Sequence, residues 1–182
     1  MRLQKHIFLI GFSGSGKSTI GRTLAVRFKY RFVDLDAVIE RHTRQKISKV
    51  FAKRGERVFR RIEVERLRQL LRSERSVVIA LGGGAFETAA VRDMARQHGV
   101  VVFLNCSQRE LCRRLRSLED RPLLVAQPRP GETPLQARRR RIRELLKKRL
   151  ANYRTADLIL STTEKSVAQS ALRLEQLLKT KL

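Results

Sequence analysis

The sequence predicts a three-layer α/β/α fold built on a central five-stranded parallel sheet. Short apolar runs alternate with longer segments whose apolar residues recur at helical spacing, and this alternation occurs five times. No repeat, low-complexity tract or interdomain linker interrupts the 182 residues, and this length fits one α/β domain. We therefore expect residues 1–182 to form a single domain.

The expected elements follow from apolar spacing and from local start signals. The strands are expected at 7–10, at a short segment ending at Val33, and at 77–81, 100–104 and 158–160. The helices are expected at 17–28, at 47–72 with a break near Gly55, at 109–118, at 135–153 and after Ser166. Ser107 with Glu110, and Ser166 with Gln169, match the capping box that opens a helix.

The first strand runs into a glycine-rich segment, GFSGSGKST, at residues 11–19. Gly11, four further residues and then Gly-Lys-Ser form the spacing of a phosphate-binding loop, in the strand-to-helix context that the pattern requires. Glycines let consecutive backbone N–H groups turn inward at a helix N-terminus, where negative charge is favoured. We expect Lys17 to reach the β- and γ-phosphates of a nucleoside triphosphate and Ser18 to give its hydroxyl to Mg²⁺. The residues expected to contact the nucleotide from this loop are Gly14, Ser15, Gly16, Lys17, Ser18 and Thr19.

Two aspartates follow the second strand. Asp34 and Asp36 lie where strand passes into helix, and the alternation of strand side chains would point both to one side. In phosphate-loop enzymes a strand-terminal carboxylate completes the Mg²⁺ site, and neither 77–81 nor 100–104 ends in an acid. Asp34 is therefore the expected metal ligand, and Asp36 is expected to contact an acceptor hydroxyl. Helix capping is the alternative, but it explains only one of the two.

Two other segments indicate a second ligand. Arg60 lies beside an apolar helical stripe with Glu63 three residues on, so the two side chains meet along the helix. The pair is either an ordinary surface ion pair or an arginine held so that its planar fork addresses an anion. Gly82, Gly83 and Gly84 place bare backbone at the sheet edge where ligands of α/β proteins bind, although a flexible turn is the alternative.

Residues 116–133 differ in character from the rest. All four prolines fall in this segment or at its edge, and its arginines include Arg116, Arg121 and Arg129, with Arg114 just before it. A basic irregular segment after a phosphate-binding core suggests a lid, at about 114–134, that closes over the triphosphate and delivers an arginine. The next helix carries four consecutive arginines, 138–141, and most of them must face solvent.

Composition limits the location and the partners. The chain has no secretory signal, no apolar run of membrane-spanning length and only two cysteines, so we expect a cytoplasmic protein that contacts no membrane. The net charge of +24 favours non-specific attraction to nucleic acid. Aromatic residues make up only 5 % and do not alternate with the basic ones, so no specific nucleic-acid partner is expected.

Three classes of phosphate-loop protein remain: a small-molecule kinase, a nucleotide switch or motor, and a basic nucleic-acid protein with incidental nucleotide binding. A switch or motor normally needs partner surfaces, more length and a strand-ending Walker-B acid, and this chain lacks that Walker-B acid. The kinase class is favoured. Its acceptor is expected to be small, because one domain holds both ligands, and anionic, because arginines gather around the expected cleft.

The chain resembles the shikimate kinase family over essentially its whole length. The resemblance lies, in order, in GFSGSGKSTIGR, the DLD pair, GERVFRRIE, LGGG, DRPLL and RLANYRTAD. It implies the nucleoside-monophosphate-kinase-like P-loop fold and transfer of the γ-phosphoryl of MgATP to the 3-hydroxyl of shikimate, on the route to chorismate and aromatic amino acids. A gluconate-type kinase of the same fold is the alternative. We expect a monomer.

The resemblance also implies residue roles. Arg60 and Arg149 would pair with the carboxylate of shikimate, and Asp36 would hold or deprotonate its hydroxyl beside Gly82 to Gly84. Ser18 and Asp34 would serve Mg²⁺. Arg121 would be the lid arginine on the phosphates and Arg114 would lie against adenine, while Lys17, Asp36 and Arg121 form the catalytic set. The helices at about 37–72 would bind the acceptor, and Arg154 is the alternative to Arg149.

Overall fold

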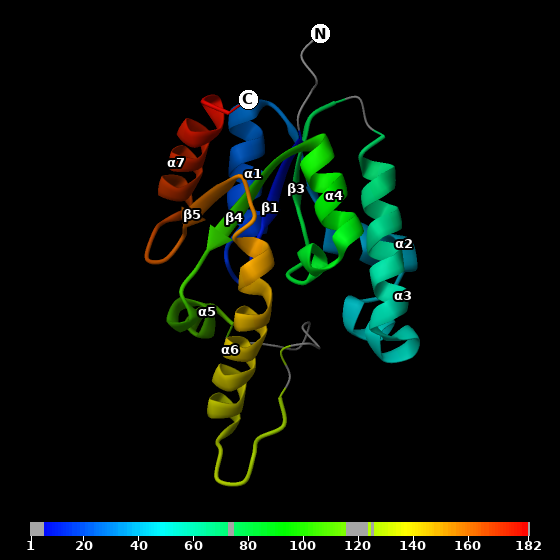
Figure 1. Ribbon diagram of the computed structural model, residues 1–182, viewed down its shortest axis with the longest axis vertical. Helices are drawn as coiled ribbons and strands as arrows, with labels where there is room; N and C mark the ends of the chain where they lie inside the picture. The colour runs from blue at the N-terminus through cyan, green and yellow to red at the C-terminus, as the bar shows by residue number, and fades with distance from the viewer. Residues whose placement is uncertain (1–5, 73–74, 116–123, 125, 182) are drawn as a thin grey trace.

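The computed structural model describes residues 6–72, 75–115, 124 and 126–181. Its strands are β1 (His6–Ile10), β2 (Arg31–Asp34), β3 (Val77–Ala80), β4 (Gly99–Asn105) and β5 (Leu158–Ser161). All of them pair in parallel, in the order β2-β3-β1-β4-β5 (Figure 1). The five-stranded parallel sheet predicted from the sequence is therefore confirmed.

Helices cover both faces of this sheet, which confirms the three layers (Figure 1). They are α1 (Lys17–Phe28), α2 (Leu35–Thr43), α3 (Ile47–Leu70), α4 (Ala89–His98), α5 (Gln108–Arg114), α6 (Pro134–Tyr153) and α7 (Val167–Lys179), with a short 3₁₀ helix, η1 (Ala85–Glu87). One face is covered by α1 and α7, and the opposite face by α2, α3 and α4. Among the described residues, none of the helices combines the length and apolar character that a membrane crossing needs.

Strand β1 shows how a continuous apolar run produces a sheet with two buried faces. Phe8 and Ile10 belong to the core under α2, α3 and α4, whereas Ile7 and Leu9 belong to the core under α1 and α7. Successive strand side chains point to opposite faces, so a strand covered on both sides is apolar at nearly every position. All five residues of β1 are buried.

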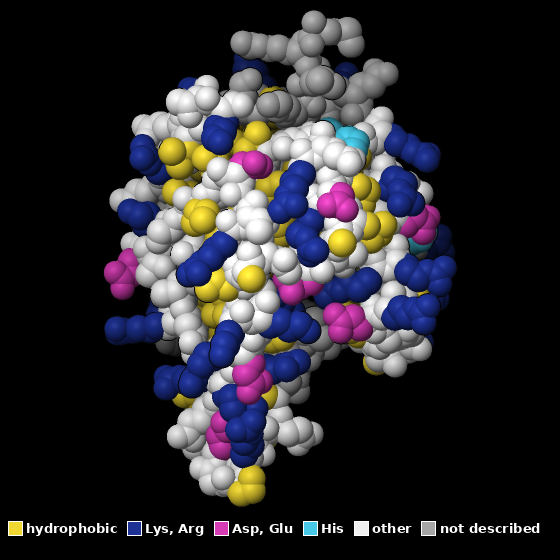
Figure 2. Space-filling model, in the orientation of Figure 1, with side chains coloured by type: hydrophobic (Ala, Val, Ile, Leu, Met, Phe, Trp, Pro, Cys, Tyr) yellow, Lys and Arg dark blue, Asp and Glu magenta, His cyan; other side chains and the backbone are white. Residues whose placement is uncertain are grey.

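Helix α6 extends beyond the sheet (Figure 1). Near its N-terminal half, Ile142 packs with Leu111, Leu115 and Phe12 in a third apolar cluster, which joins α6 to α5 and to the phosphate loop. At its C-terminal end Tyr153 stacks against Phe103 of β4, with ring centroids 5.0 Å apart. The helix is thus anchored near its middle and at its C-terminal end, whereas its first turn projects away from the sheet, in a region where Lys and Arg side chains gather on the surface (Figure 1 and Figure 2).

The helix boundaries agree with several local signals. Gly55 interrupts α3 with φ 75° and ψ 168°, as predicted. The capping box of Ser166 and Gln169 opens α7, as predicted. A second box that we did not predict, between Thr133 and Gln136, opens α6. In each box a side chain satisfies one of the backbone N–H groups that a helix start leaves unpaired.

The predicted capping box at α5 is only half formed. The Oγ of Ser107 accepts the N–H of Glu110 at 3.3 Å. The Glu110 carboxylate does not return to Ser107; it binds Arg113 and Arg114 instead. The N–H of Ser107 donates to Thr163 Oγ1 at 2.9 Å. Two nearby guanidinium groups compete successfully for a carboxylate that would otherwise cap the helix.

The predicted lid falls partly outside the described residues, because 116–123 and 125 are not among them. Arg116 and Arg121 therefore have no structural account here. Helix α5 ends at Arg114, earlier than predicted, and residues 126–133 are irregular up to the start of α6. Leu124 is buried within the third apolar cluster.

The arginine run at the start of α6 is less solvated than expected. Arg139 is exposed, but Arg138 donates to the carbonyl of Leu115 at 3.2 Å. Arg140 pairs with Glu132 at 2.9 Å. Acceptors on the preceding segments therefore hold two of these arginines, which no pattern within the helix itself indicates.

Candidate active site

The phosphate loop lies at the carboxyl edge of the sheet, between β1 and α1. Gly14 and Gly16 have φ of 81° and 99°, a left-handed conformation that side chains with a Cβ rarely adopt. Gly16 is the N-cap of α1 and has no side chain with which to cap the first turn. The backbone N–H groups of this turn are therefore left for an anion, as the spacing predicts.

Lys17 lies over this loop. Its Nζ donates to the carbonyls of Gly11 and Phe12 at 3.0 and 2.9 Å. Beside the loop is a cavity of about 490 Å³, a size that suits a nucleotide. Its walls come from the loop, the start of α1, Arg114 and the start of α7: Gly14, Gly16, Lys17, Ser18, Thr19, Ile20, Arg114, Thr162, Lys165, Ser166, Val167 and Ser170.

Ser18 and Asp34 meet as predicted. The Oγ of Ser18 donates to Asp34 Oδ2 at 2.6 Å, so α1 and the end of β2 present two hard oxygen ligands side by side. Mg²⁺ is usually held by one or two such ligands together with phosphate oxygens and water. Within the part of the chain that the structure describes, no three His, Cys, Asp or Glu side chains gather as metal ligands. Ser18 and Asp34 together fit an Mg²⁺ ion that is bound jointly with phosphates.

The sequence-based explanation of how the two aspartates are oriented is wrong in one respect. Asp36 lies in the first turn of α2, so its direction is set by the helix and not by strand alternation. Asp34 is the N-cap of that helix, and its Oδ1 accepts the N–H of Asp36 at 3.1 Å. The Asp34 carboxylate can therefore cap the helix with Oδ1 and contact Ser18 with Oδ2 at the same time.

The three glycines after β3 lie against charged side chains. A Cβ on Gly82 would lie 2.6 Å from Asp36 Oδ1 and 3.1 Å from Glu63 Oε1, and a Cβ on Gly84 would overlap Arg60 Nη2. Real Cβ atoms essentially never lie within 3.0 Å of another group, so Asp36 or Arg60 would have to move. Close approach, and not turn flexibility, is therefore the reason for glycine at these positions.

Arg60 is held by two carboxylates. Its Nη1 donates to Glu63 at 2.8 Å and its Nη2 donates to Glu56 at 3.0 Å. Glu63 is fully buried, and burial raises its pKa to about 7 although Arg60 opposes this. Burial also acts to lower the pKa of Arg60, but the charge and hydrogen bonds of Glu63 and Glu56 outweigh it and raise that pKa. The interpretation of Arg60 and Glu63 as an ordinary surface ion pair is therefore wrong, because the Glu63 carboxylate is buried inside the protein.

Arg149, and not Arg154, reaches the glycine turn. The Arg149 side chain is buried, its Nη1 donates to the carbonyl of Gly83 at 2.8 Å, and its guanidinium lies 5.5 Å from the ring centre of Phe12. Arg154 is exposed at the C-terminal cap of α6. The hydroxyl of Tyr153 also donates to Gly83. Sequence reasoning missed this tyrosine, although its position four residues after Arg149 places both on one helix face.

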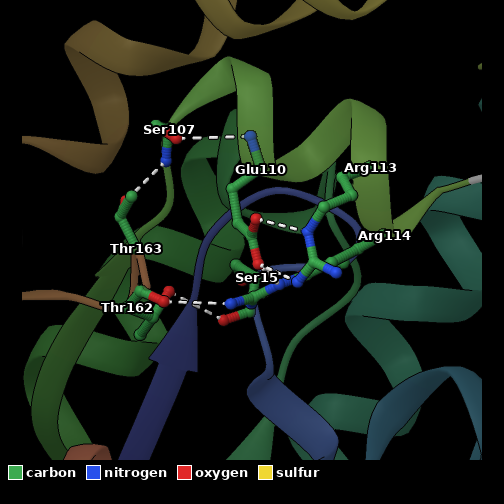
Figure 3. Close-up of polar contacts among 8 residues, drawn as sticks. Ser15, Ser107, Glu110, Arg113, Arg114, Thr162 and Thr163 are labelled. Carbon is green, nitrogen blue, oxygen red and sulfur yellow. Dashed lines mark hydrogen bonds and ion pairs between the residues drawn. The ribbon is translucent and has the colours of Figure 1, made fainter. Parts of the chain in front are cut away.

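Arg114 stands at the other end of the site, beside the phosphate loop (Figure 3). It donates to the carbonyls of Gly14 and Thr162 at 3.2 and 3.0 Å. Thr162 in turn donates its hydroxyl to the carbonyl of Ser15 at 3.1 Å. The loop after β5 therefore braces the phosphate loop, a contact between segments nearly 150 residues apart that the sequence did not reveal.

The geometry thus combines a phosphate-binding cavity with a second set of charged groups around a bare glycine turn. The family model described as shikimate kinase matches residues 13–179 of this sequence. The chain belongs to the shikimate kinase family. The shikimate kinase of Chlorobium limicola is 42% identical over 174 residues, covering 93% of this chain and 84% of that protein. The shikimate kinase of Chlorobium chlorochromatii is 44% identical over 165 residues, covering 90% and 85%.

Solved structures of shikimate kinases have the same fold. The enzyme from Acinetobacter baumannii in complex with shikimate has a TM-score of 0.88 at 32% identity, with 97% of this chain and 94% of that chain covered. The shikimate kinase from Bacteroides thetaiotaomicron has a TM-score of 0.83 at 32% identity, with 96% and 98% covered. A gluconokinase from Sinorhizobium meliloti, at 20% identity and a TM-score of 0.58, shares the fold alone, with 100% and 99% covered.

Proposed function

We propose that this protein transfers the γ-phosphoryl group of MgATP to the 3-hydroxyl of shikimate, giving shikimate 3-phosphate and ADP on the route to chorismate and aromatic amino acids. Membership of the shikimate kinase family supports this activity. The observation that carries it at the site is the set formed by Asp36, Arg60 and Arg149 around the Gly82–Gly84 turn. Two arginines suit the one carboxylate of shikimate, and a carboxylate suits its hydroxyl.

The acceptor half works mainly by positioning. Arg60 is fixed by the buried Glu63, and Arg149 is fixed by the carbonyl of Gly83 and by Phe12. Both guanidinium groups are therefore oriented before the substrate arrives, so less freedom is lost on binding. With the carboxylate of shikimate held by this pair, Asp36 accepts a hydrogen bond from the 3-hydroxyl and takes its proton as the oxygen attacks phosphorus.

The donor half works mainly by charge. The loop residues Gly14 to Thr19 surround the phosphates with N–H groups, and the ammonium of Lys17 follows the γ-phosphoryl as it moves. Ser18 and Asp34 would hold Mg²⁺, which when bound neutralises charge on the phosphate oxygens. Arg114 lines the cavity, and from the resemblance it is assigned to the adenine. From the resemblance, Arg121 is assigned to the phosphates as the lid arginine.

The activity is tested by an ADP-release assay with the purified protein and a panel of acceptors. We expect rapid MgATP-dependent turnover with shikimate and only background rates with gluconate and with nucleoside monophosphates. Faster turnover with gluconate would replace this proposal with the gluconate-type kinase. Mass spectrometry of the product identifies the phosphorylated acid.

We also propose the domain organisation, the location and the oligomeric state of the protein. Residues 1–182 form one domain with acceptor-binding helices at about 37–72 and a lid at about 114–134, and the protein is a cytoplasmic monomer. Light scattering tests the monomer. The net charge of +24 gives weak, non-specific binding to nucleic acid, so we expect any such binding to fall steeply with added salt and to show no sequence preference.

A further inference from the structure

The guanidinium group of Arg114 is fixed in orientation by three protein acceptors (Figure 3). Its Nε donates to Glu110 Oε1 at 2.7 Å, its Nη1 to the carbonyl of Gly14 at 3.2 Å and its Nη2 to the carbonyl of Thr162 at 3.0 Å. The N–H bonds of a guanidinium all lie in its plane. Three acceptors in three directions therefore fix that plane.

This arrangement decides which part of Arg114 a ligand meets. One N–H on each nitrogen is used by the protein, and Arg114 lines the nucleotide cavity. Arginine faces stack on aromatic rings, whereas pairing with phosphate uses the N–H edge. The geometry therefore suits Arg114 to the base of the nucleotide and leaves the phosphates to the loop.

Glu110 is the charged member of the three acceptors and the one that a substitution can remove. Its side chain is nearly buried in the first turn of α5, and hydrogen bonds from Arg113 and Arg114 lower its pKa to about 2. It is therefore ionised at any working pH. Leu111, the next residue, packs in the third apolar cluster, so the helix turn that carries Glu110 is held in place.

We propose that Glu110 is a positioning residue for the nucleotide: by binding Nε of Arg114 it sets the plane on which the base stacks. This inference rests on the proposed place of Arg114 in the nucleotide site. Arg113 provides a matched control, because it binds the same carboxylate at 2.7 and 2.8 Å but is 64% exposed and does not line the cavity.

The test compares steady-state constants of Glu110→Ala, Arg113→Ala and Arg114→Ala with those of the unmodified enzyme. For Glu110→Ala we expect the KM for ATP to rise about tenfold, with the KM for shikimate within twofold of normal. Inhibition by inorganic triphosphate, which has no base, is expected to be unchanged. Arg113→Ala is expected to leave all three constants unchanged, and Arg114→Ala to raise the KM for ATP at least as much as Glu110→Ala.

The possible outcomes separate this inference from the proposed function. An unchanged KM for ATP in Glu110→Ala, with a raised one in Arg114→Ala, overturns the role of Glu110 alone. Equal weakening of ATP and inorganic triphosphate also overturns it, because Glu110 would then support the whole loop. An unchanged KM for ATP in Arg114→Ala overturns both this inference and the proposed role of Arg114.

A conservative variant distinguishes the loss of the Glu110 contact from a folding defect. Glu110→Gln keeps the side-chain length and one oxygen that accepts from Nε of Arg114, while the paired charge is lost. We expect its KM for ATP to rise only about threefold, between those of the unmodified enzyme and Glu110→Ala. If the alanine variant fails to fold, as judged by circular dichroism, no rise in the glutamine variant overturns the proposal.

Discussion

Gly82→Ala places one methyl group between the two carboxylates of the acceptor site. Its Cβ would lie 2.6 Å from Asp36 Oδ1 and 3.1 Å from Glu63 Oε1, whereas ordinary van der Waals contact begins at 3.4 Å. The Asp36 carboxylate must therefore withdraw by about 0.8 Å. Gly82 is not in the left-handed region, so this displacement comes from the contact and not from backbone strain.

The expected effect is on turnover. A misplacement of about 1 Å at a reacting group costs on the order of 100-fold in rate, or about 2.7 kcal/mol in the activation barrier. We therefore expect kcat with shikimate to fall about 100-fold at saturating MgATP. The KM for ATP is expected to stay within about twofold, because the phosphate loop follows a different strand, β1.

Gly84→Ala is the matched control, since it adds the same methyl group two residues away. There the Cβ overlaps Nη2 of Arg60, the end of a long side chain, so we expect a higher KM for shikimate with a smaller loss of kcat. Thermal melts establish that both variants are folded. A folded Gly82→Ala enzyme with near-normal kcat would refute the assignment of Asp36 to the reacting hydroxyl.

Four other substitutions test the remaining parts of the site. Lys17→Ala should reduce turnover to background while circular dichroism still shows a folded protein; near-normal activity would contradict the phosphate-loop assignment. Asp34→Asn should raise the Mg²⁺ concentration needed for half-maximal rate about tenfold in a metal titration, and an unchanged requirement would exclude Asp34 from the metal site. Arg60→Ala should raise the KM for shikimate far more than the KM for ATP, and equal effects would make Arg60 merely structural. The pKa of Glu63 is raised by burial to about 7 from an ordinary value of 4.5, so the folded state holds a proton that the unfolded state releases. Stability should therefore fall as pH rises from about 4.5 to about 7, and urea unfolding of Glu63→Gln should show a flatter dependence over that range.

The parts of the molecule that the sequence predicted well are those encoded by neighbouring residues. The phosphate loop is a continuous motif, and the buried strands are visible in the sequence as apolar runs. The break at Gly55 and the cap at Ser166 are likewise local. These features depend on backbone geometry over a few residues, so a single sequence contains the information.

The parts that it did not predict depend on which segments become neighbours. The spacing of Arg60 and Glu63 shows that they meet, but only the packing of α3 on the sheet shows that Glu63 is buried. The brace between Thr162 and the phosphate loop joins opposite ends of the chain. Glu110 fits a capping pattern, and its actual partners are chosen by competition among nearby charges. Such contacts need the tertiary arrangement first.

The strand order also fixes the distance between the two strand ends that lead into the site. Because β3 lies between β1 and β2, the strand ends that lead to the donor loop and to the acceptor aspartate are two interstrand spacings apart, roughly 9.5 Å. Adjacent strands would leave about 4.8 Å between these ends, and three spacings would leave about 14 Å. Backbone hydrogen bonding allows only these discrete steps. The separation of the two strand ends is therefore fixed by the backbone, and the loops and side chains that extend from them span the rest of the distance, as Ser18 and Asp34 do when they meet at 2.6 Å.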